Sequence, residues 1–214
     1  MDPVEGNLHH MRENYGEGNL DMDSIFPSPF MQFEVWYQDA SNANIAEPNA
    51  MVLSTATKDG RPSSRVVLLK EYNNKGFIFF TNYESRKGIE IAENPYACLN
   101  FWWPPLERQV RIEGVLEKIP AADSDAYFYS RPKGSQAGAI ASPQSKVIES
   151  RAWLEQTFIR IQLEQEIKRP DHWGGYILRA ERIEFWQGRT NRLHDRLLYS
   201  IQDDASWTVV RLAP

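Results

Sequence analysis

Apolar and polar residues alternate with a period of two in short segments along the chain, as expected for strands that bury one face. The clearest alternation runs through Arg108–Lys118, and the aromatic segment Tyr96–Trp103 precedes it. Pro104-Pro105 separates these two segments. Together they predict an antiparallel pair of strands.

Turn signals separate the other strand-like segments. Lys58-Asp59-Gly60 lies between Ala50–Ala56 and Ser63–Glu71, which predicts a hairpin. Asn73-Asn74-Lys75-Gly76 then leads into Phe77–Thr81. Strands are also predicted in the last third of the chain, at Trp173–Ala180, Arg182–Gln187, Leu197–Ile201 and Trp207–Leu212.

Elsewhere apolar residues recur every three to four positions, which predicts amphipathic helices. Ser28 followed by Pro29 is an N-cap and first-turn signal, and the helix that they begin is expected to end near Ala40. Ser85 is expected to cap a short helix that runs to Glu93. Further helices are predicted at Ala121–Ser130 and from Ser142 to about Lys168, with a loop of small and polar residues over Arg131–Gly138.

The chain thus contains six to eight short strands, mostly joined as hairpins, with helices inserted around them. This order predicts a mainly β, α+β fold, in which an antiparallel barrel carries peripheral helices, rather than a parallel α/β sheet. Residues 1–25 are polar, rich in Gly and Asn and without an apolar period, and we expect them to form a mobile arm. Residues 26–214 are expected to form a single domain.

Composition narrows the class of protein. The 214 residues are 42% hydrophobic and 25% charged, which is ordinary for a soluble globular protein. A net charge of −5 argues against a broad grip on nucleic acid or an anionic membrane. The chain has a single cysteine, Cys98, no apolar stretch of membrane-spanning length and an acidic N-terminal segment, so we expect a cytoplasmic protein. The histidines lack partners at metal-ligand spacing, and no metal site is predicted.

Signatures of dinucleotide-binding folds, P-loops and α/β-hydrolases are absent from the sequence. Phosphate-binding residue types instead recur beside turns or aromatic residues, as Arg65 with Lys70, Arg86 with Lys87, Arg131 with Ser135, and Arg192 with Arg196. Arginine forks, lysine charges and serine hydroxyls match phosphate oxygens, so these groups in an acidic protein predict a site for two phosphates. At the helix start beside Arg86 and Lys87, an anion site and a solvated basic turn fit the sequence equally well.

Two details of these cations affect the prediction. Arg65 and Lys70 are five residues apart, so on a regular strand their side chains point to opposite faces, and we expect them to contact different ligands. The densest cluster lies within Phe185–Arg196, where three arginines, a histidine and an aspartate fall within eight residues. We take this stretch as part of the candidate site.

Motifs spread over the chain resemble those of one known family: Arg65-Val66-Val67-Leu68-Leu69-Lys70, Thr81-Asn82 with Ser85-Arg86-Lys87, Leu106-Glu107-Arg108-Gln109-Val110, Ser130-Arg131-Pro132, Phe185-Trp186-Gln187-Gly188, Arg192-Leu193-His194-Asp195-Arg196 and Arg211-Leu212-Ala213-Pro214. The family is pyridoxine (pyridoxamine) 5′-phosphate oxidase, and the resemblance extends from about Arg12 to the C-terminus. It implies an FMN-binding split β-barrel and a homodimer with two active sites at the subunit interface. It also implies oxidation of pyridoxine or pyridoxamine 5′-phosphate to pyridoxal 5′-phosphate, with O2 reoxidising the flavin and yielding hydrogen peroxide.

The resemblance also assigns residues to the two ligands. The residues that correspond to FMN contacts are Arg65, Val66, Val67, Leu68, Leu69, Lys70, Phe80, Thr81, Arg86, Lys87, Gln109, Gln144, Ser145, Trp186 and Arg196. The residues that correspond to substrate contacts are Lys70, Tyr127, Arg131 and Ser135 around the phosphate, Arg192, Leu193 and His194 over the pyridine ring, and Arg12 and Tyr15 in an arm that can close over the substrate. Phe80 departs from the family pattern, because a tyrosine is common there.

Hydride transfer needs the substrate and flavin rings stacked at near-attack distance, and two anchored phosphates would fix that stacking from opposite ends. We hypothesise that Arg192 packs on the substrate ring and that His194, with Asp195, orients the reacting group and handles its proton. Adjacent residues on a strand face opposite ways, so the sequence equally allows Asp195 to point away and brace the loop. Arg189 is assigned to neither ligand.

Two other functions stay open at this point. One is a different FMN split-barrel enzyme, such as a flavin reductase-like protein, which would leave Arg131 and Ser135 without a ligand. The other is a non-catalytic protein that stores FMN or carries pyridoxal 5′-phosphate.

Overall fold

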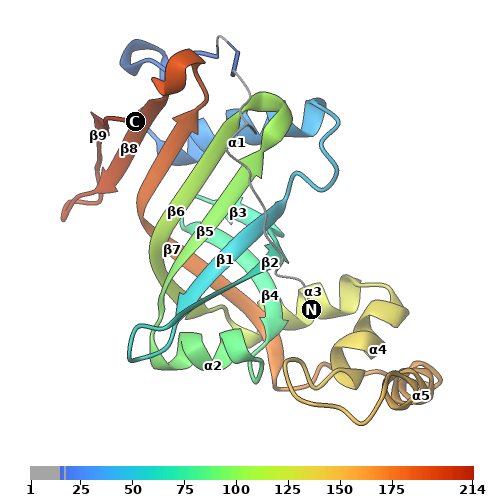
Figure 1. The fold of residues 1–214 in the computed structure, drawn as a ribbon. Helices are drawn as coiled ribbons and strands as arrows, with labels where there is room; N and C mark the ends of the chain where they lie inside the picture. Colours follow the sequence, from blue (N-terminus) through green and yellow to red (C-terminus); the bar gives the residue numbers. More distant parts are fainter. Residues whose placement is uncertain (1–14, 17) are drawn as a thin grey trace, which may run out of the picture.

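A computed structural model describes residues 15, 16 and 18–214. One antiparallel sheet of nine strands organises them, in the order β2-β1-β5-β6-β7-β4-β3, and β8 and β9 continue from β7 (Figure 1). The strands are β1 (Ala50–Ala56), β2 (Pro62–Leu68), β3 (Glu71–Asn73), β4 (Gly76–Asn82), β5 (Tyr96–Trp103), β6 (Arg108–Lys118), β7 (Trp173–Gln187), β8 (Asp195–Ile201) and β9 (Trp207–Arg211). The predicted antiparallel barrel-like fold with peripheral helices is therefore confirmed.

Strand β7 is one continuous strand, whereas the sequence predicted two strands at this place. Its first half pairs with β4 and its second half with β8, while β6 follows its other edge throughout. The register against β6 shifts between Glu113 and Gly114, which pair with Arg182 and Ala180. Such a bulge bends a strand without ending it, so β7 can leave one partner for the next and curl the sheet.

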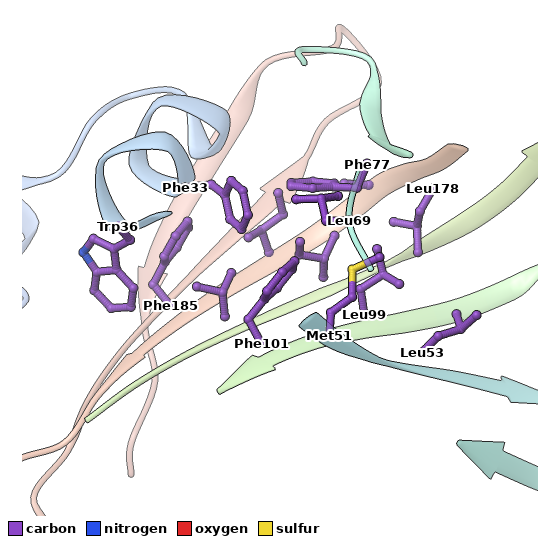
Figure 2. Close-up of a cluster of buried hydrophobic side chains, with 14 of the residues drawn as sticks. Phe33, Trp36, Met51, Leu53, Leu69, Phe77, Leu99, Phe101, Leu178 and Phe185 are labelled. Atoms are coloured by element: carbon purple, nitrogen blue, oxygen red, sulfur yellow. The ribbon is translucent and has the colours of Figure 1, made fainter. Parts of the chain in front are cut away.

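The core fills the inside of this curl. Helix α1 (Pro29–Asn42) packs Phe33 and Trp36 against buried side chains of the sheet, and Figure 2 shows Phe33 lying among Phe77, Phe101 and other apolar groups. Each fully buried side chain of this size contributes about 2–3 kcal/mol through area removed from water. The alternation seen in β6 follows from this arrangement, because every second residue faces the core.

The other helices are α2 (Arg86–Glu93), α3 (Ala121–Ser130), α4 (Lys133–Ala141) and α5 (Arg151–Gln162). Two predictions were wrong here. The expected loop over Arg131–Gly138 is mostly helix α4, and the expected long helix from Ser142 begins only at Arg151 after the N-cap Ser150. Tertiary packing explains α4, because Ala137 and Ala141 lie buried in a second small core, which outweighs the low helix propensity of its glycines.

The end of the predicted mobile arm contacts the barrel. Leu20 is buried in the main core, and the backbone N–H of Ser24 bonds to the carbonyl of Asp21 in a short 3-10 turn. The ordered contacts therefore begin before residue 26, where the single domain was expected to start. Residues 1–14, and with them Arg12, lie outside the described residues.

No helix in the described part of the chain is long and apolar enough to cross a membrane.

Candidate functional site

A cavity of about 680 Å³ lies between β2, β4 and the helices α3 and α4. Four cations line it, and none of the described residues that line it is a carboxylate. The lining residues that the sequence assigned to a ligand are Arg65, Val66, Val67, Leu68, Lys70, Phe80, Thr81, Lys87, Tyr127, Arg131, Ser135 and Gln144. A cavity with this charge balance fits anionic ligands.

One end of the cavity is built at the start of α2. Ser85 caps this helix as predicted, because its hydroxyl accepts a bond from the backbone N–H of Gly88. The Lys87 ammonium donates to Ser85 Oγ (3.2 Å) and to Gln144 Oε1 (2.7 Å), and Thr81 Oγ1 donates to the same amide oxygen (3.3 Å). Burial, followed by repulsion from Arg65, lowers the pKa of Lys87 to about 8. The geometry thus favours an anion site over a solvated turn.

Arg65 is held beside Lys87 by a buried carboxylate. Glu90, 3% exposed, accepts bonds from Thr55 Oγ1 (2.5 Å), Ser63 Oγ (2.6 Å) and Arg65 Nη2 (3.3 Å). Its other oxygen accepts a bond from Arg86 Nε (2.8 Å). Burial opposes ionisation of Glu90, but the bonds from Ser63, Thr55 and Arg86 outweigh it and lower its pKa to about 2.

Another cation of the cavity, Arg131, lies between α3 and α4. The Arg131 guanidinium carbon sits 4.7 Å from the centre of the Trp173 ring, and Phe80 stacks on Tyr127 with ring centres 3.9 Å apart. The buried Arg131 Nη1 has no hydrogen-bond partner among the described residues. Burial also lowers the pKa of Arg131. An anion in the cavity would supply the missing acceptor.

Arg65 and Lys70 line the same cavity, contrary to the argument from a regular strand. The strand β2 ends at Leu68, and the Lys70 N–H bonds to the carbonyl of Ile78 on β4. The chain therefore crosses from one strand pair to another between the two cations, and the two-residue side-chain period no longer applies. Whether they contact different ligands stays a prediction.

Six of the predicted FMN contacts lie outside the cavity lining, and three of them are next in the chain to lining residues. Leu69 packs in the main core, and its N–H and carbonyl both bond to Asn49. Arg86 turns its guanidinium to Glu90. Ser145 follows Gln144 with a positive φ of 71° and an exposed side chain.

Other predicted residues form a second group on the outer face of the sheet. Trp102, Gln109, Trp186 and Arg196 pair in register across β5, β6, β7 and β8. Paired residues point to one face, so these four side chains form a single row. Trp102 is 43% exposed and meets Trp186 edge to face at 6.0 Å between ring centres. Glu184, 2% exposed, holds Arg196 through Nε (2.8 Å) and Nη2 (3.1 Å).

The turn between β7 and β8 adds His194 to this row. Its ring centre lies 4.6 Å from that of Trp186 and 5.6 Å from that of Tyr15. His194 Nδ1 accepts a bond from the Arg189 N–H (3.0 Å), so a neutral ring carries its proton on Nε2. Burial, and then the charge of Arg192, lower the pKa of His194. Arg192 and Leu193 are exposed beside it, and Arg192 has a positive φ of 61°.

The two groups lie at opposite ends of β7 (Figure 1). Trp173 begins the strand at the cavity, and Trp186 stands near its other end. At about 3.3 Å of rise per residue, these two residues are separated by roughly 40 Å of strand. One chain therefore does not bring all the predicted site residues together, because the cavity residues and the group around Trp186 and His194 stay apart.

Sequence reasoning missed the carboxylates that hold the arginines. Glu90 follows Arg86 by four positions, a helix ion-pair spacing that the sequence displays. Glu184 gave no comparable signal, since its partners Arg111 and Arg196 come from neighbouring strands. The described residues contain no cluster of three His, Cys, Asp or Glu side chains able to hold a metal ion.

Comparison with known proteins gives two family matches. Residues 37–165 match the family model described as pyridoxamine 5′-phosphate oxidase. Residues 173–214 match the model described as the pyridoxine 5′-phosphate oxidase C-terminal dimerisation region. The second match contains β7, β8 and β9, and thus the turn with Arg192 and His194.

Curated relatives are similar over nearly their whole length. Proteins named pyridoxine/pyridoxamine 5′-phosphate oxidase are 52% identical in Salinibacter ruber and 55% identical in Paraburkholderia phymatum, each covering 97% of this chain and 99% of the relative. Among solved structures, PhzG from Burkholderia lata in complex with tetrahydrophenazine-1-carboxylic acid is 31% identical with a TM-score of 0.87, covering 92% of this chain and 99% of that chain. A pyridoxamine 5′-phosphate oxidase-related, FMN-binding protein from Nostoc punctiforme is 16% identical with a TM-score of 0.72, covering 89% of this chain and 100% of that chain, and shows the fold alone.

Proposed function

The chain belongs to the pyridoxine/pyridoxamine 5′-phosphate oxidase family, and on this premise we propose that it oxidises pyridoxine or pyridoxamine 5′-phosphate to pyridoxal 5′-phosphate with FMN as its cofactor. The observation that supports this most is the cavity, which four cations line and to which the described part of the chain contributes no carboxylate. FMN, when bound, would supply the acceptor for the hydride from substrate C4′ and a route for the two electrons to O2, which yields hydrogen peroxide; with the amine substrate, water then hydrolyses the substrate imine and ammonia leaves. The residues of the chain supply binding and orientation.

The α2 end of the cavity suits the flavin phosphate. Arg65 supplies a guanidinium charge paired with Glu90, and Lys87 supplies a desolvated point charge beside the polar Thr81 and Gln144. Arg86 adds charge at the helix start, where the dipole also favours an anion. The donor set therefore fits a phosphate.

The α3 and α4 end suits the substrate phosphate. Arg131 presents a buried Nη1 without an acceptor among the described residues, and Lys70, Tyr127 and Ser135 also line the cavity. A second phosphate held there would fix the substrate from the side opposite to the flavin phosphate.

We further propose that the active site needs a homodimer. Gln109, Trp186, Arg192, His194 and Arg196 are separated from the cavity by the length of β7, so a second copy has to bring them to it. The match to a C-terminal dimerisation region supports this arrangement. Each of two symmetric sites would then combine the cavity of one chain with the β7–β8 turn of the other.

His194 is proposed as the group that orients the substrate hydroxyl or amine. Its lowered pKa keeps the ring neutral at physiological pH, and its Nδ1 is occupied by the Arg189 N–H. The remaining nitrogen, Nε2, carries the proton and can donate a hydrogen bond to the substrate hydroxyl oxygen or amine nitrogen, which orients the reacting group. Arg192 beside it would pack on the substrate ring and keep His194 neutral through its charge.

The test is an absorbance spectrum of the FMN-loaded protein before and after anaerobic addition of pyridoxine 5′-phosphate. We expect the flavin band to bleach and to return when air is admitted, with one hydrogen peroxide formed per substrate oxidised. A flavin band that stays unchanged with both phosphorylated substrates would contradict the oxidase. Bound pyridoxal 5′-phosphate or FMN without oxygen consumption would instead support a carrier of the same fold.

The competing proposal is an enzyme that acts on a different substrate, because the similar PhzG structure contains a ring carboxylic acid rather than a phosphate ester. The cations around Arg131 favour the phosphorylated substrates. Bleaching by a dihydroaromatic carboxylic acid, without bleaching by pyridoxine 5′-phosphate, would favour the PhzG-like activity.

A further inference from the structure

Residues 15, 16 and 18–21, called here the N-terminal segment, lie against the turn between β7 and β8. Tyr15 packs edge to face on Trp186, with ring centres 5.8 Å apart, and on His194. The Gly16 N–H donates to both carboxylate oxygens of Glu107, at 2.7 and 3.0 Å. The segment thus contacts the same side chains that are proposed to meet the substrate.

An ion-pair group centred on Asp195 holds the next residues of the segment. Asp195 Oδ1 accepts from Arg211 Nη1 at 2.5 Å, and Oδ2 lies 3.4 Å from Arg189 Nη1. The Leu20 N–H also donates to Oδ2 at 3.4 Å. The Asp195 side chain is only 14% exposed, so these contacts are partly shielded from water.

The two arginines also bond directly to the segment. Arg189 Nη1 donates to the carbonyl of Gly18 (3.0 Å) and to Asn19 Oδ1 (3.1 Å). Arg211 Nη2 donates to the carbonyl of Leu20 (3.1 Å) and to Asp21 Oδ1 (2.9 Å). Asp195 therefore fixes both guanidinium groups at the positions from which they bond the segment.

Close packing gives independent support. A Cβ on Gly188 would lie 3.0 Å from Tyr15 Cγ and 2.9 Å from Glu107 Cβ, and a Cβ on Gly18 would lie 2.3 Å from Gln187 Nε2. The segment and the end of β7 approach more closely than side chains would permit. Leu20, buried in the core, anchors the far end of the segment.

We infer that Asp195 is a positioning residue, which through Arg189 and Arg211 holds the N-terminal segment so that Tyr15 stays against His194 and Trp186. This inference rests on the proposed function for its effect on substrate, but the contacts themselves do not. If the N-terminal segment is already held in place before the substrate binds, less conformational entropy is lost on binding. Asp195 thus faces the segment and braces it, which decides between the two orientations that the sequence allowed.

The test compares Asp195→Asn with Asp203→Asn in the FMN-loaded full-length protein. Asp203 lies in the turn after β8 and serves as the matched control. For Asp195→Asn we expect hydrogen exchange of the peptide containing Leu20 to be about tenfold faster, because the local bonds that protect it are lost. We expect KM for pyridoxine 5′-phosphate to rise about tenfold with kcat within about twofold, as for lost ground-state binding. The affinity for FMN should not change.

Unchanged hydrogen exchange of that peptide would show that Asp195 does not hold the N-terminal segment. Faster exchange with an unchanged KM would show that holding the segment does not affect substrate binding. A second variant, Arg211→Gln, should give the same exchange and KM changes, and the double variant should be no worse than either single one, because both remove one network. If the wild-type protein oxidises neither phosphorylated substrate, the proposed function fails. The exchange experiment still decides whether Asp195 holds the segment.

Discussion

At the scale of single residues, the cavity is notable for charges that lack full compensation. Lys87 is buried among neutral polar groups, and Arg131 keeps one buried nitrogen unpaired among the described residues. Burying such groups costs free energy unless a partner arrives. An anionic ligand would provide that partner, so the site and its ligand are expected to stabilise each other.

The pH dependence of flavin binding follows from Lys87. Its pKa is lowered to about 8, so the ammonium loses its charge as the pH rises through that value. We expect the FMN dissociation constant to rise by roughly tenfold from about pH 7 to about pH 9.5, since one charge-assisted hydrogen bond is lost. Flavin fluorescence quenching measures this. Lys87→Met should bind weakly with a flat pH profile over this range, whereas Lys58→Met, in the β1–β2 turn, should behave like wild type.

Arg131 permits a test of the second phosphate site. Arg131→Met should raise KM for pyridoxine 5′-phosphate by at least about tenfold, because a bond between two charged groups is lost. FMN affinity should not change, since the α2 end of the cavity is intact. Steady-state oxygen consumption gives KM, with Lys133→Met at the start of α4 as the control. Equal losses of FMN and substrate affinity would contradict two separate phosphate sites.

At the scale of elements, the start of α2 links stability to ligand binding. The Ser85 hydroxyl accepts bonds from the Gly88 N–H and from the Lys87 ammonium, and it donates to the Asn82 carbonyl (2.6 Å). In the α5 cap, the Ser150 hydroxyl bonds only to the Trp153 N–H among the described residues. The two caps therefore offer a matched comparison.

Ser85→Ala should lower the free energy of unfolding by about 1–2 kcal/mol through the lost cap. It should also weaken FMN binding severalfold, because Lys87 loses one of its two side-chain partners. Ser150→Ala should cost up to about 1 kcal/mol without changing FMN affinity. Urea unfolding and fluorescence titration separate the two effects. Equal FMN affinity in both variants would show that the Ser85 contact does not orient Lys87.

At the scale of the whole molecule, the curled sheet sets the cavity and the β7–β8 turn at opposite ends of one strand. A row with the exposed Trp102 and the half-buried Trp186 lies on the outer face beside that turn. Such an aromatic surface is a suitable place for a second copy to pack. The proposed composite site has a consequence that can be measured with hybrid dimers.

With pyridoxine 5′-phosphate well below the wild-type KM, Arg131→Ala and His194→Ala should each keep about a tenth or less of the wild-type activity as homodimers. In a hybrid dimer, one site combines the unaltered cavity of one chain with the unaltered turn of the other. If the two variants assort randomly after co-expression, about a quarter of the wild-type activity should return, because half of the dimers are hybrids with one intact site. Activity that stays at the level of the single variants would contradict sites shared between chains.

Much of the fold could be read from the sequence because its signals are local. The alternation in Arg108–Lys118, the cap at Ser85 and the turn at Gly76 each predict a structure that forms at that place. The wrong predictions arose where packing against residues far away in the chain decides the secondary structure. Helix α4 forms because Ala137 and Ala141 reach a core made by other elements, and β7 continues because a bulge lets it change partners.

The candidate site shows the same division. The sequence by itself determined the residue types for two phosphates, and the resemblance to a family rests on them. Only the tertiary structure brought Arg65 and Lys70 into one cavity, set Glu90 and Glu184 against their arginines, and turned Asp195 toward the N-terminal segment. The physical reason is that side-chain chemistry is a property of each residue, whereas charge pairing and distance depend on how strands far apart in the chain are laid beside each other.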